Sequence, residues 1–384
     1  MSEGPVSVDD LWIERIPRDL GFETLSKRLT GRPRWGPYLF ILTAVVIHLP
    51  VLSVVGWLQT GSLSIAANPG EMFQVVAWPA VVWMIIRTKR KYVETVQDLP
   101  DAIDEDIQSL DIGWGPVTHL LTLAGVPANP SGKTDAKLGE VVPPRVRYIV
   151  LGSGLVFYGW QLLTNHAGLV GPVASLTGPV VAAIRFYLII PFVLYPIGAE
   201  FLALVIGALV FLPFKIRRAR LIDFSDPHGF AGLAPAGEMF KNVAVSYFIL
   251  LTLFALFQTV AIGTSPVDQF SLTLLFAGLL VGLLLFFGPM VWIKSFIGAA
   301  KEVKIESLAS HSREVGSTDE LFPYAEPESV EHANQYTYNH IRMQRVESTS
   351  EFPFDIAMMQ EVLFALVLPY ISSLAFDFVL QRLG

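Results

Sequence analysis

The chain has 384 residues, of which 52% are hydrophobic and only 16% are charged. Ordinary soluble domains carry about 25% charged residues, so this composition argues against a soluble globular protein. The net charge of −7 argues against nucleic acid as a partner, and the lack of cysteine excludes disulfides, thiolate metal sites and cysteine nucleophiles. The apolar residues gather in blocks long enough to cross a bilayer, which takes about 20 residues per helix.

Residues 1–36 precede the first apolar block and combine polar residues with a helical apolar rhythm. The apolar positions are Leu11, Ile13, Ile16, Leu20, Phe22 and Leu25. We therefore predict an amphipathic segment that lies against the membrane or against the cytoplasmic part of the protein. A secretory signal peptide would place its apolar core nearer the start, so the N-terminus is predicted to be retained.

Six apolar blocks predict an all-α, polytopic transmembrane helical bundle. The first two spans fall within 37–86: one covers 37–58, and the other begins between 63 and 73 and ends at 86. The remaining four fall within 148–293 and are predicted at 148–163, 187–214, 243–262 and 270–293. The connection between the third and fourth spans is predicted to be a weakly polar loop.

Polar sequence returns after the sixth span and predicts a cytoplasmic helical segment over 294–353. Within it, 294–315 is predicted to continue the helix of the last span, and 327–347 to form a second polar helix. The C-terminal segment 354–384 is apolar again, although it contains Glu361. We predict that it is embedded in the membrane and leave open whether it crosses, re-enters or lies at the interface.

The distribution of Lys and Arg predicts the orientation of the bundle. Of the 27 basic residues, 25 lie in the polar segments 1–36, 87–147, 215–241 and 294–353. The three alternate loops contain none. Because positive residues mark the cytoplasmic side, we predict a multi-pass protein of the cell membrane with its N-terminus in the cytoplasm.

Glu200 and His48 are the candidate ion-pathway residues. Glu200 lies about 12 residues from either end of the predicted fourth span, so helical rise puts it near the middle of the membrane. A carboxyl group there needs a partner, a proton or water. His48 lies midway along the first span, and a His–Glu pair at one depth would titrate near neutral pH. The alternative is that each side chain is satisfied inside the bundle as a structural group.

The loop after the fourth span, Asp223–Gly237, combines turn residues with glycines that permit tight backbone paths. Asp226 and His228, together with backbone amides, could bind an ion or a phosphate. Alternatively, the loop docks against the cytoplasmic ends of the helices. Its sequence Asp226-Pro-His-Gly-x-x-Gly-Leu resembles an element of prokaryotic multi-span membrane proteins. The resemblance implies that the loop is a landmark of that family and implies no activity.

Small residues spaced four apart predict close helix packing at two places. One pair is Gly278 and Gly282 in the sixth span, and the other is Ala199 and Ala203 beside Glu200. The pattern leaves open whether the packing partner is the same chain or a second copy in a homo-oligomer.

No catalytic or cofactor motif is present, so the chain is predicted not to be an enzyme and to need no cofactor; a metal site is left open. Neither His-Glu-x-x-His nor Gly-x-Ser-x-Gly occurs. The leading hypothesis is a channel or transporter for a proton or a monovalent cation. The alternative is a non-transporting sensor or scaffold that acts on a cytoplasmic protein partner through its polar helical segments. In either case the lipid bilayer is the principal partner.

Overall fold

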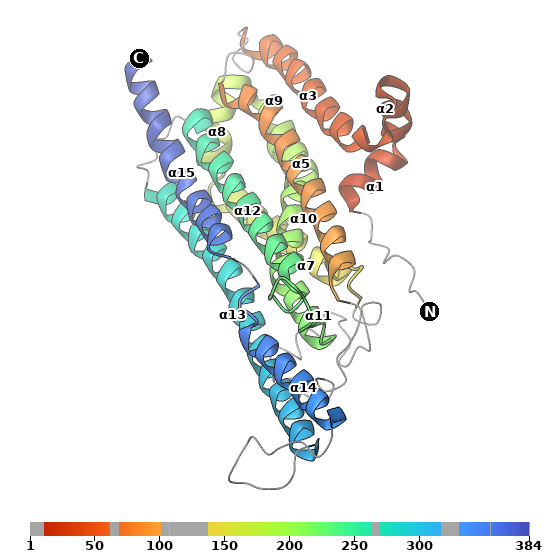
Figure 1. The fold of residues 1–384 in the computed structure, drawn as a ribbon. Coiled ribbons are helices and arrows are strands. Elements are labelled where there is room, and N and C mark those ends of the chain that lie inside the picture. The colour runs from red at the N-terminus through yellow and green to blue at the C-terminus, as the bar shows by residue number, and fades with distance from the viewer. Residues whose placement is uncertain are drawn as a thin grey trace.

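A computed structural model describes residues 11–61, 69–100, 107, 137–262, 269–315, 330–353 and 355–383. All regular secondary structure in these residues is helical, and they form no strand. The helices pack as an elongated bundle from which one helical pair projects at one end (Figure 1). The predicted all-α helical bundle is therefore confirmed.

The N-terminal segment forms two short helices, α1 (Trp12–Asp19) and α2 (Phe22–Thr30), ahead of a 3-10 turn, η1 (Pro33–Trp35). Gly21 and Gly31 end or separate these helices with left-handed φ angles of 82° and 73°, which glycine adopts without strain. Leu11 and Ile13 are fully buried, whereas Leu20 is 63% exposed. Only part of the predicted apolar rhythm therefore packs against the rest of the chain.

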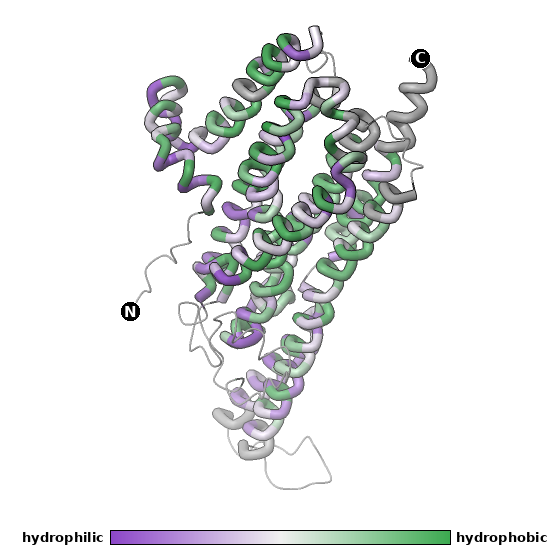
Figure 2. Tube along the Cα trace, turned by 180° about the vertical axis from the view of Figure 1, so that it is seen from behind, coloured by the Kyte–Doolittle hydropathy of each residue, from purple (hydrophilic) through white to green (hydrophobic). Residues whose placement is uncertain are grey.

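Five helices in the described residues are long and apolar enough to cross a membrane. They are Pro33–Thr60, Pro144–Thr164, Pro179–Arg218, Ala234–Leu256 and Leu275–His311. The first contains α3 (Gly36–Thr60), and the second is α7 (Pro144–Thr164). Figure 2 shows hydrophobic residues along these helices and hydrophilic residues gathered at α1 and α2 and at one end of the bundle.

The predicted second span lies in α5 (Pro69–Asp98), which is not among the five helices of membrane-spanning character found in the described residues. Its apolar stretch is short because Gln74 interrupts it near one end and Arg87 stops it at the other. The helix nevertheless packs against α3 and α12 (Ala234–Ile262) inside the bundle.

The connection after α7 is helical, contrary to the prediction of a loop. It contains α8 (His166–Thr177) and then α9 (Pro179–Ile184), separated by Gly178 with a φ of 93°. The segment lacks charged residues and is mostly apolar, so helix formation satisfies its backbone groups. The weak polarity of the sequence was not a sufficient indication of a loop.

The helix over Pro179–Arg218 contains two π-helical stretches between α-helical ones. It runs from α9 through a π-helical stretch, η3 (Arg185–Leu194), into α10 (Tyr195–Ile206). A second π-helical stretch, η4 (Gly207–Phe211), leads into α11 (Leu212–Arg218). Proline lacks a backbone N–H and therefore disturbs the regular hydrogen-bond ladder, and Pro191 lies inside the first π-helical stretch.

The C-terminal helices pack against one another, and two of them form one end of the molecule. α12 packs against α5, against α13 (Gln269–Val315) and against α15 (Ile356–Leu383). α13 continues without a break from the last predicted span into the polar segment, as the sequence predicts. There it packs against α14 (Val330–Ser348), and the two form the projecting pair in Figure 1. We call this pair the α13–α14 hairpin.

Candidate functional site

Glu200 is buried in α10, with 4% of the residue exposed. Its Oε1 atom lies 4.0 Å from Nη1 of Arg147, on the first turn of α7. Its carboxylate also accepts a hydrogen bond from the backbone N–H of Trp12 in α1. One cation and one amide from two other elements therefore offset only part of the cost of burying the carboxylate.

A second ion pair lies close to the first and fixes α1 to the bundle. Lys89 of α5 bonds to Glu14 of α1, and the side chains are 12% and 23% exposed. Glu14 Oε2 also accepts the backbone N–H of Leu11 at 3.2 Å, which caps the start of α1. The four charged groups, Glu14, Lys89, Arg147 and Glu200, thus come from α1, α5, α7 and α10; we call them the charge cluster.

A cavity of about 200 Å³ adjoins Glu200 and Arg147. Ala199 and Ala203 line it on the α10 side, and Ala199 also lines a separate, mostly apolar cavity of about 570 Å³. Within the described residues, Glu200 Oε1 and two guanidinium nitrogens of Arg147 form no hydrogen bond. The pair therefore adjoins a small cavity rather than a fully bonded network.

Glu200 lies near the middle of the helix over Pro179–Arg218, and its depth in the membrane stays a prediction. Its partners are Arg147, at the start of α7, and Trp12, in the polar N-terminal segment. The Glu200 side chain therefore faces the start of α7 and the N-terminal segment. The prediction assumed a span over 187–214, whereas the helix covers Pro179–Arg218 and is longer than a bilayer requires.

The other predicted ion-pathway residue is His48. It belongs to α3, but its side chain lies outside the described part of the chain. The predicted pairing of His48 with Glu200 therefore stays a prediction. The partner that the structure gives to Glu200, Arg147, was missed because the contact joins residues 53 positions apart.

The Asp223–Gly237 loop is organised around the carboxylate of Asp226. It accepts backbone N–H groups of His228, Phe230 and Gly232 at 3.0, 3.3 and 3.0 Å. Partial burial acts to raise the pKa of Asp226, but these three donors outweigh it and hold the pKa below its ordinary value. The carboxylate thus serves as the centre of a turn.

The same loop docks onto neighbouring segments. Gly229 accepts the backbone N–H of Ser350 at 2.7 Å, just after α14. A Cβ atom at Gly232 would lie 2.6 Å from Cγ of Pro100, which follows α5. His228 is exposed, and its backbone N–H donates to the Asp226 carboxylate. In the described residues no group of three or more acidic or histidine side chains could hold a metal ion.

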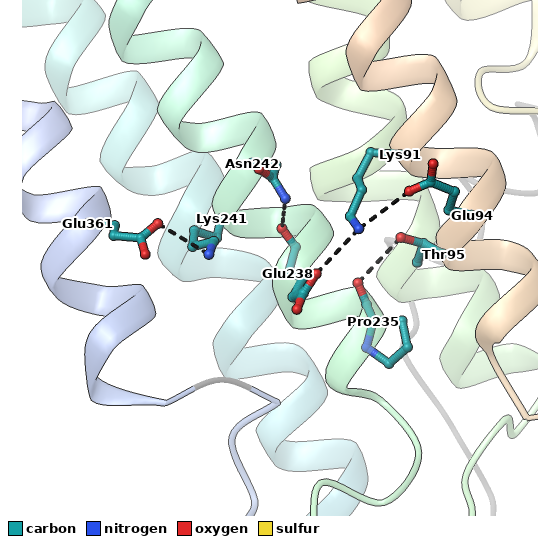
Figure 3. Close-up of polar contacts among 8 residues, drawn as sticks. All are labelled: Lys91, Glu94, Thr95, Pro235, Glu238, Lys241, Asn242 and Glu361. Carbon is teal, nitrogen blue, oxygen red and sulfur yellow. Dashed lines mark hydrogen bonds and ion pairs between the residues drawn. The ribbon is translucent and has the colours of Figure 1, made fainter. Parts of the chain in front are cut away.

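Two separate sets of ion pairs, which sequence reasoning missed, join α12 to two neighbouring helices (Figure 3). Lys91 of α5 lies 3.4 Å from Glu94 and 3.3 Å from Glu238 of α12. One turn further along α12, Lys241 lies 3.2 Å from Glu361 of α15. Because Glu361 pairs with a residue near the start of α12, α15 begins at the same end of the bundle as α12.

The glycine pair of the sixth span faces α12. A Cβ atom at Gly278 would lie 2.9 Å from Leu251, and one at Gly282 would lie 2.6 Å from Tyr247. The hydroxyl of Tyr247 also donates to the carbonyl of Gly278 at 2.8 Å. The packing partner at this ridge is therefore the same chain.

Comparisons with protein-family models, with curated proteins and with solved structures found no match for this chain. The fold by itself defines a class: an all-helical bundle with several helices of membrane-spanning length and apolarity. That class is compatible with an integral membrane protein.

Proposed function

We propose that the chain is a multi-pass protein of the cell membrane that acts as a sensor or scaffold through the α13–α14 hairpin. In this proposal the N-terminus and the polar segments lie in the cytoplasm, where 25 of the 27 basic residues would face. The observation that carries the proposal is the length of α13. Its 47 residues extend about 70 Å, more than twice the roughly 30 Å hydrocarbon core.

Hydrogen bonds at the base of the hairpin join its two helices to each other and join α14 to the Asp223–Gly237 loop. Lys301 of α13 donates to the carbonyls of Glu347 and Thr349 at 2.9 Å each, at the end of α14. Arg345 of α14 donates to the carbonyl of Ser225 in the Asp223–Gly237 loop. A tilt of α13 in the membrane would therefore move α14 together with the loop, which supports a role in coupling.

The outer face of α14 offers a surface for a partner. Tyr338 and Ile341 are 60% and 59% exposed although the helix is otherwise polar. They lie three residues apart and therefore share one face of the helix. Large apolar side chains exposed together on a polar element are typical of protein interaction surfaces.

Photo-cross-linking in native membranes tests this proposal. A cross-linking amino acid at Ile341 should give a discrete adduct, and Tyr338→Asp in the same chain should abolish it. The control carries the cross-linker at Leu284, which is 66% exposed on the apolar part of α13 and should give lipid adducts only. An adduct of twice the chain mass would indicate a homo-oligomer. Absence of any protein adduct from α14 would contradict the proposal.

Ion transport is the second candidate. The buried Glu200–Arg147 pair beside a cavity supports it, as do the two π-helical stretches, because such stretches are frequent at functional sites. Proteoliposomes with the purified protein should then show proton or cation flux that Glu200→Gln changes. Glu361→Gln, which removes the 60% exposed carboxylate that pairs with Lys241, is the matched control. Flux in neither protein would remove this candidate.

A further inference from the structure

A large cleft opens between the N-terminal helices and α5. Its volume is about 1160 Å³, and five basic side chains line it against only two acidic ones. The basic residues are Arg18, Arg32, Arg34, Lys89 and Arg90, and the acidic ones are Glu14 and Glu23. Since Lys89 pairs with Glu14, the remaining charge of the cleft is strongly positive. We call this space the basic cleft.

The backbone that carries two of the arginines is held in place. The hydroxyl of the buried Ser26 donates to the carbonyl of Arg32 at 2.6 Å, and Gly31 turns the chain with a φ of 73°. A Cβ atom at Gly36 would lie 2.9 Å from Cγ of Glu23, so α2 lies tightly against the start of α3. The basic groups are therefore presented by a preformed turn, which lowers the entropic cost of binding a ligand.

The basic cleft lies at the boundary between polar and apolar sequence. A helix of membrane-spanning character begins at Pro33, and the apolar part of α5 ends at Ile86. Trp35 and Trp83 line the cleft and are 50% and 45% exposed. Tryptophans with a polar and an apolar side are enriched where headgroups meet the hydrocarbon core.

Apolar surface continues from the cleft along α5. Val76 lies seven residues, or about two turns, from Trp83, so both share one face of the helix. Val76 is 68% exposed. A ligand with a negatively charged head in the cleft could therefore lay an apolar chain along this face.

We propose that the basic cleft binds the headgroup of an anionic phospholipid from the leaflet on the polar side of the bundle. Arg32, Arg34 and Arg90 contact the phosphate, since guanidinium groups match phosphate oxygens in bidentate geometry. Trp35 and Trp83 flank the glycerol region. The preformed turn and the convergence of arginines from two distant segments distinguish this site from scattered basic residues at a membrane surface.

Native mass spectrometry of the full chain in detergent, with added phosphatidylglycerol or phosphatidylcholine, tests the proposal. The wild type should bind phosphatidylglycerol more tightly. The triple variant Arg32→Gln, Arg34→Gln and Arg90→Gln should weaken that binding by about 100-fold, at roughly fivefold per basic residue. The charge-matched control Lys27→Gln, Arg28→Gln and Arg342→Gln removes exposed basic residues outside the cleft and should bind as the wild type does.

Equal weakening in both triple variants would overturn the proposal, because it would show general charge attraction. Unchanged binding in the cleft variant would overturn it as well. Inorganic phosphate is added in a third arm, and displacement of the lipid by millimolar phosphate would identify a soluble-anion site instead. If the triple variant does not retain the thermal unfolding temperature of the wild type, Arg90→Gln alone takes its place and should weaken binding about fivefold.

Discussion

At the residue scale, the charge cluster determines how α1 joins the bundle. Each carboxylate in it has a cation nearby: Glu14 has Lys89, and Glu200 has Arg147. A buried carboxylate without a partner would cost several kcal/mol, so the docking of α1 requires the pair between Glu14 and Lys89. The Arg147–Glu200 pair joins α7 to α10 and meets α1 at the backbone amide of Trp12. The short helix is in this way held by charge as well as by the buried side chains of Leu11 and Ile13.

Replacing Arg147 by Met should destabilise the protein more than replacing both members of its pair. The single variant leaves the Glu200 carboxylate buried beside only the Trp12 amide, which should cost about 3 kcal/mol. The double variant Arg147→Met, Glu200→Leu removes that uncompensated charge and should recover most of the loss. Unfolding in detergent with a graded denaturant measures both. Equal loss in the two variants would contradict the role of Arg147 as the partner of Glu200.

Asp226 should make the stability of the Asp223–Gly237 loop depend on pH in the acid range. Its pKa in the folded protein lies below the ordinary value of 3.8, so its contribution is fully present above that value. The contribution is lost as the pH falls through the lower, folded-state pKa. Asp226→Asn should reduce stability by about 1–3 kcal/mol at pH 7 and remove this acid-range decline. Unfolding curves between pH 2 and 7 test it, and an unchanged decline in the variant would assign the titration to another group.

At the element scale, long blocks of apolar residues were sufficient to predict helices. The residues at which each helix begins and ends depend on contacts with neighbouring segments. The third span, predicted at 148–163, forms the helix Pro144–Thr164, and the predicted continuation of the last span is α13. The helical connection α8 was missed because weak polarity in a short stretch resembles a loop. The π-helical stretches were not predicted, since a proline in the sequence does not indicate which hydrogen bonds replace the lost one.

Gly282 and Gly288 of α13 have different surroundings, so their replacement by alanine should change the stability of the protein in opposite directions. At Gly282 a Cβ atom would lie 2.8 Å or less from two aromatic rings of α12, so Gly282→Ala should destabilise by about 1–3 kcal/mol. At Gly288 nothing lies within 4 Å, so Gly288→Ala should stabilise by up to about 1 kcal/mol through helix propensity. Thermal unfolding in detergent compares them, and an equal response would refute the close packing of α12 on α13.

At the scale of the whole molecule, the membrane class was predictable from composition, and the site was predictable only in part. Glu200 was identified as a buried acid because a carboxylate in an apolar run is unusual. Its partner, the Lys89–Glu14 pair and the basic cleft were not identified. Each depends on segments far apart in the chain, and a single sequence contains no signal for such contacts. The resemblance of the Asp226–Leu233 stretch to prokaryotic membrane proteins stays a prediction.

The proposed function requires that the α13–α14 hairpin project into the cytoplasm, on the side opposite the C-terminal end of α7. The chain has no cysteine, so single cysteines can report each position without background. Ser310 lies in the polar part of α13 and Thr164 at the end of α7, and both are exposed. In intact cells a membrane-impermeant maleimide should label Thr164→Cys at once and Ser310→Cys only after permeabilisation. Labelling of both positions from the same side would contradict the proposed function.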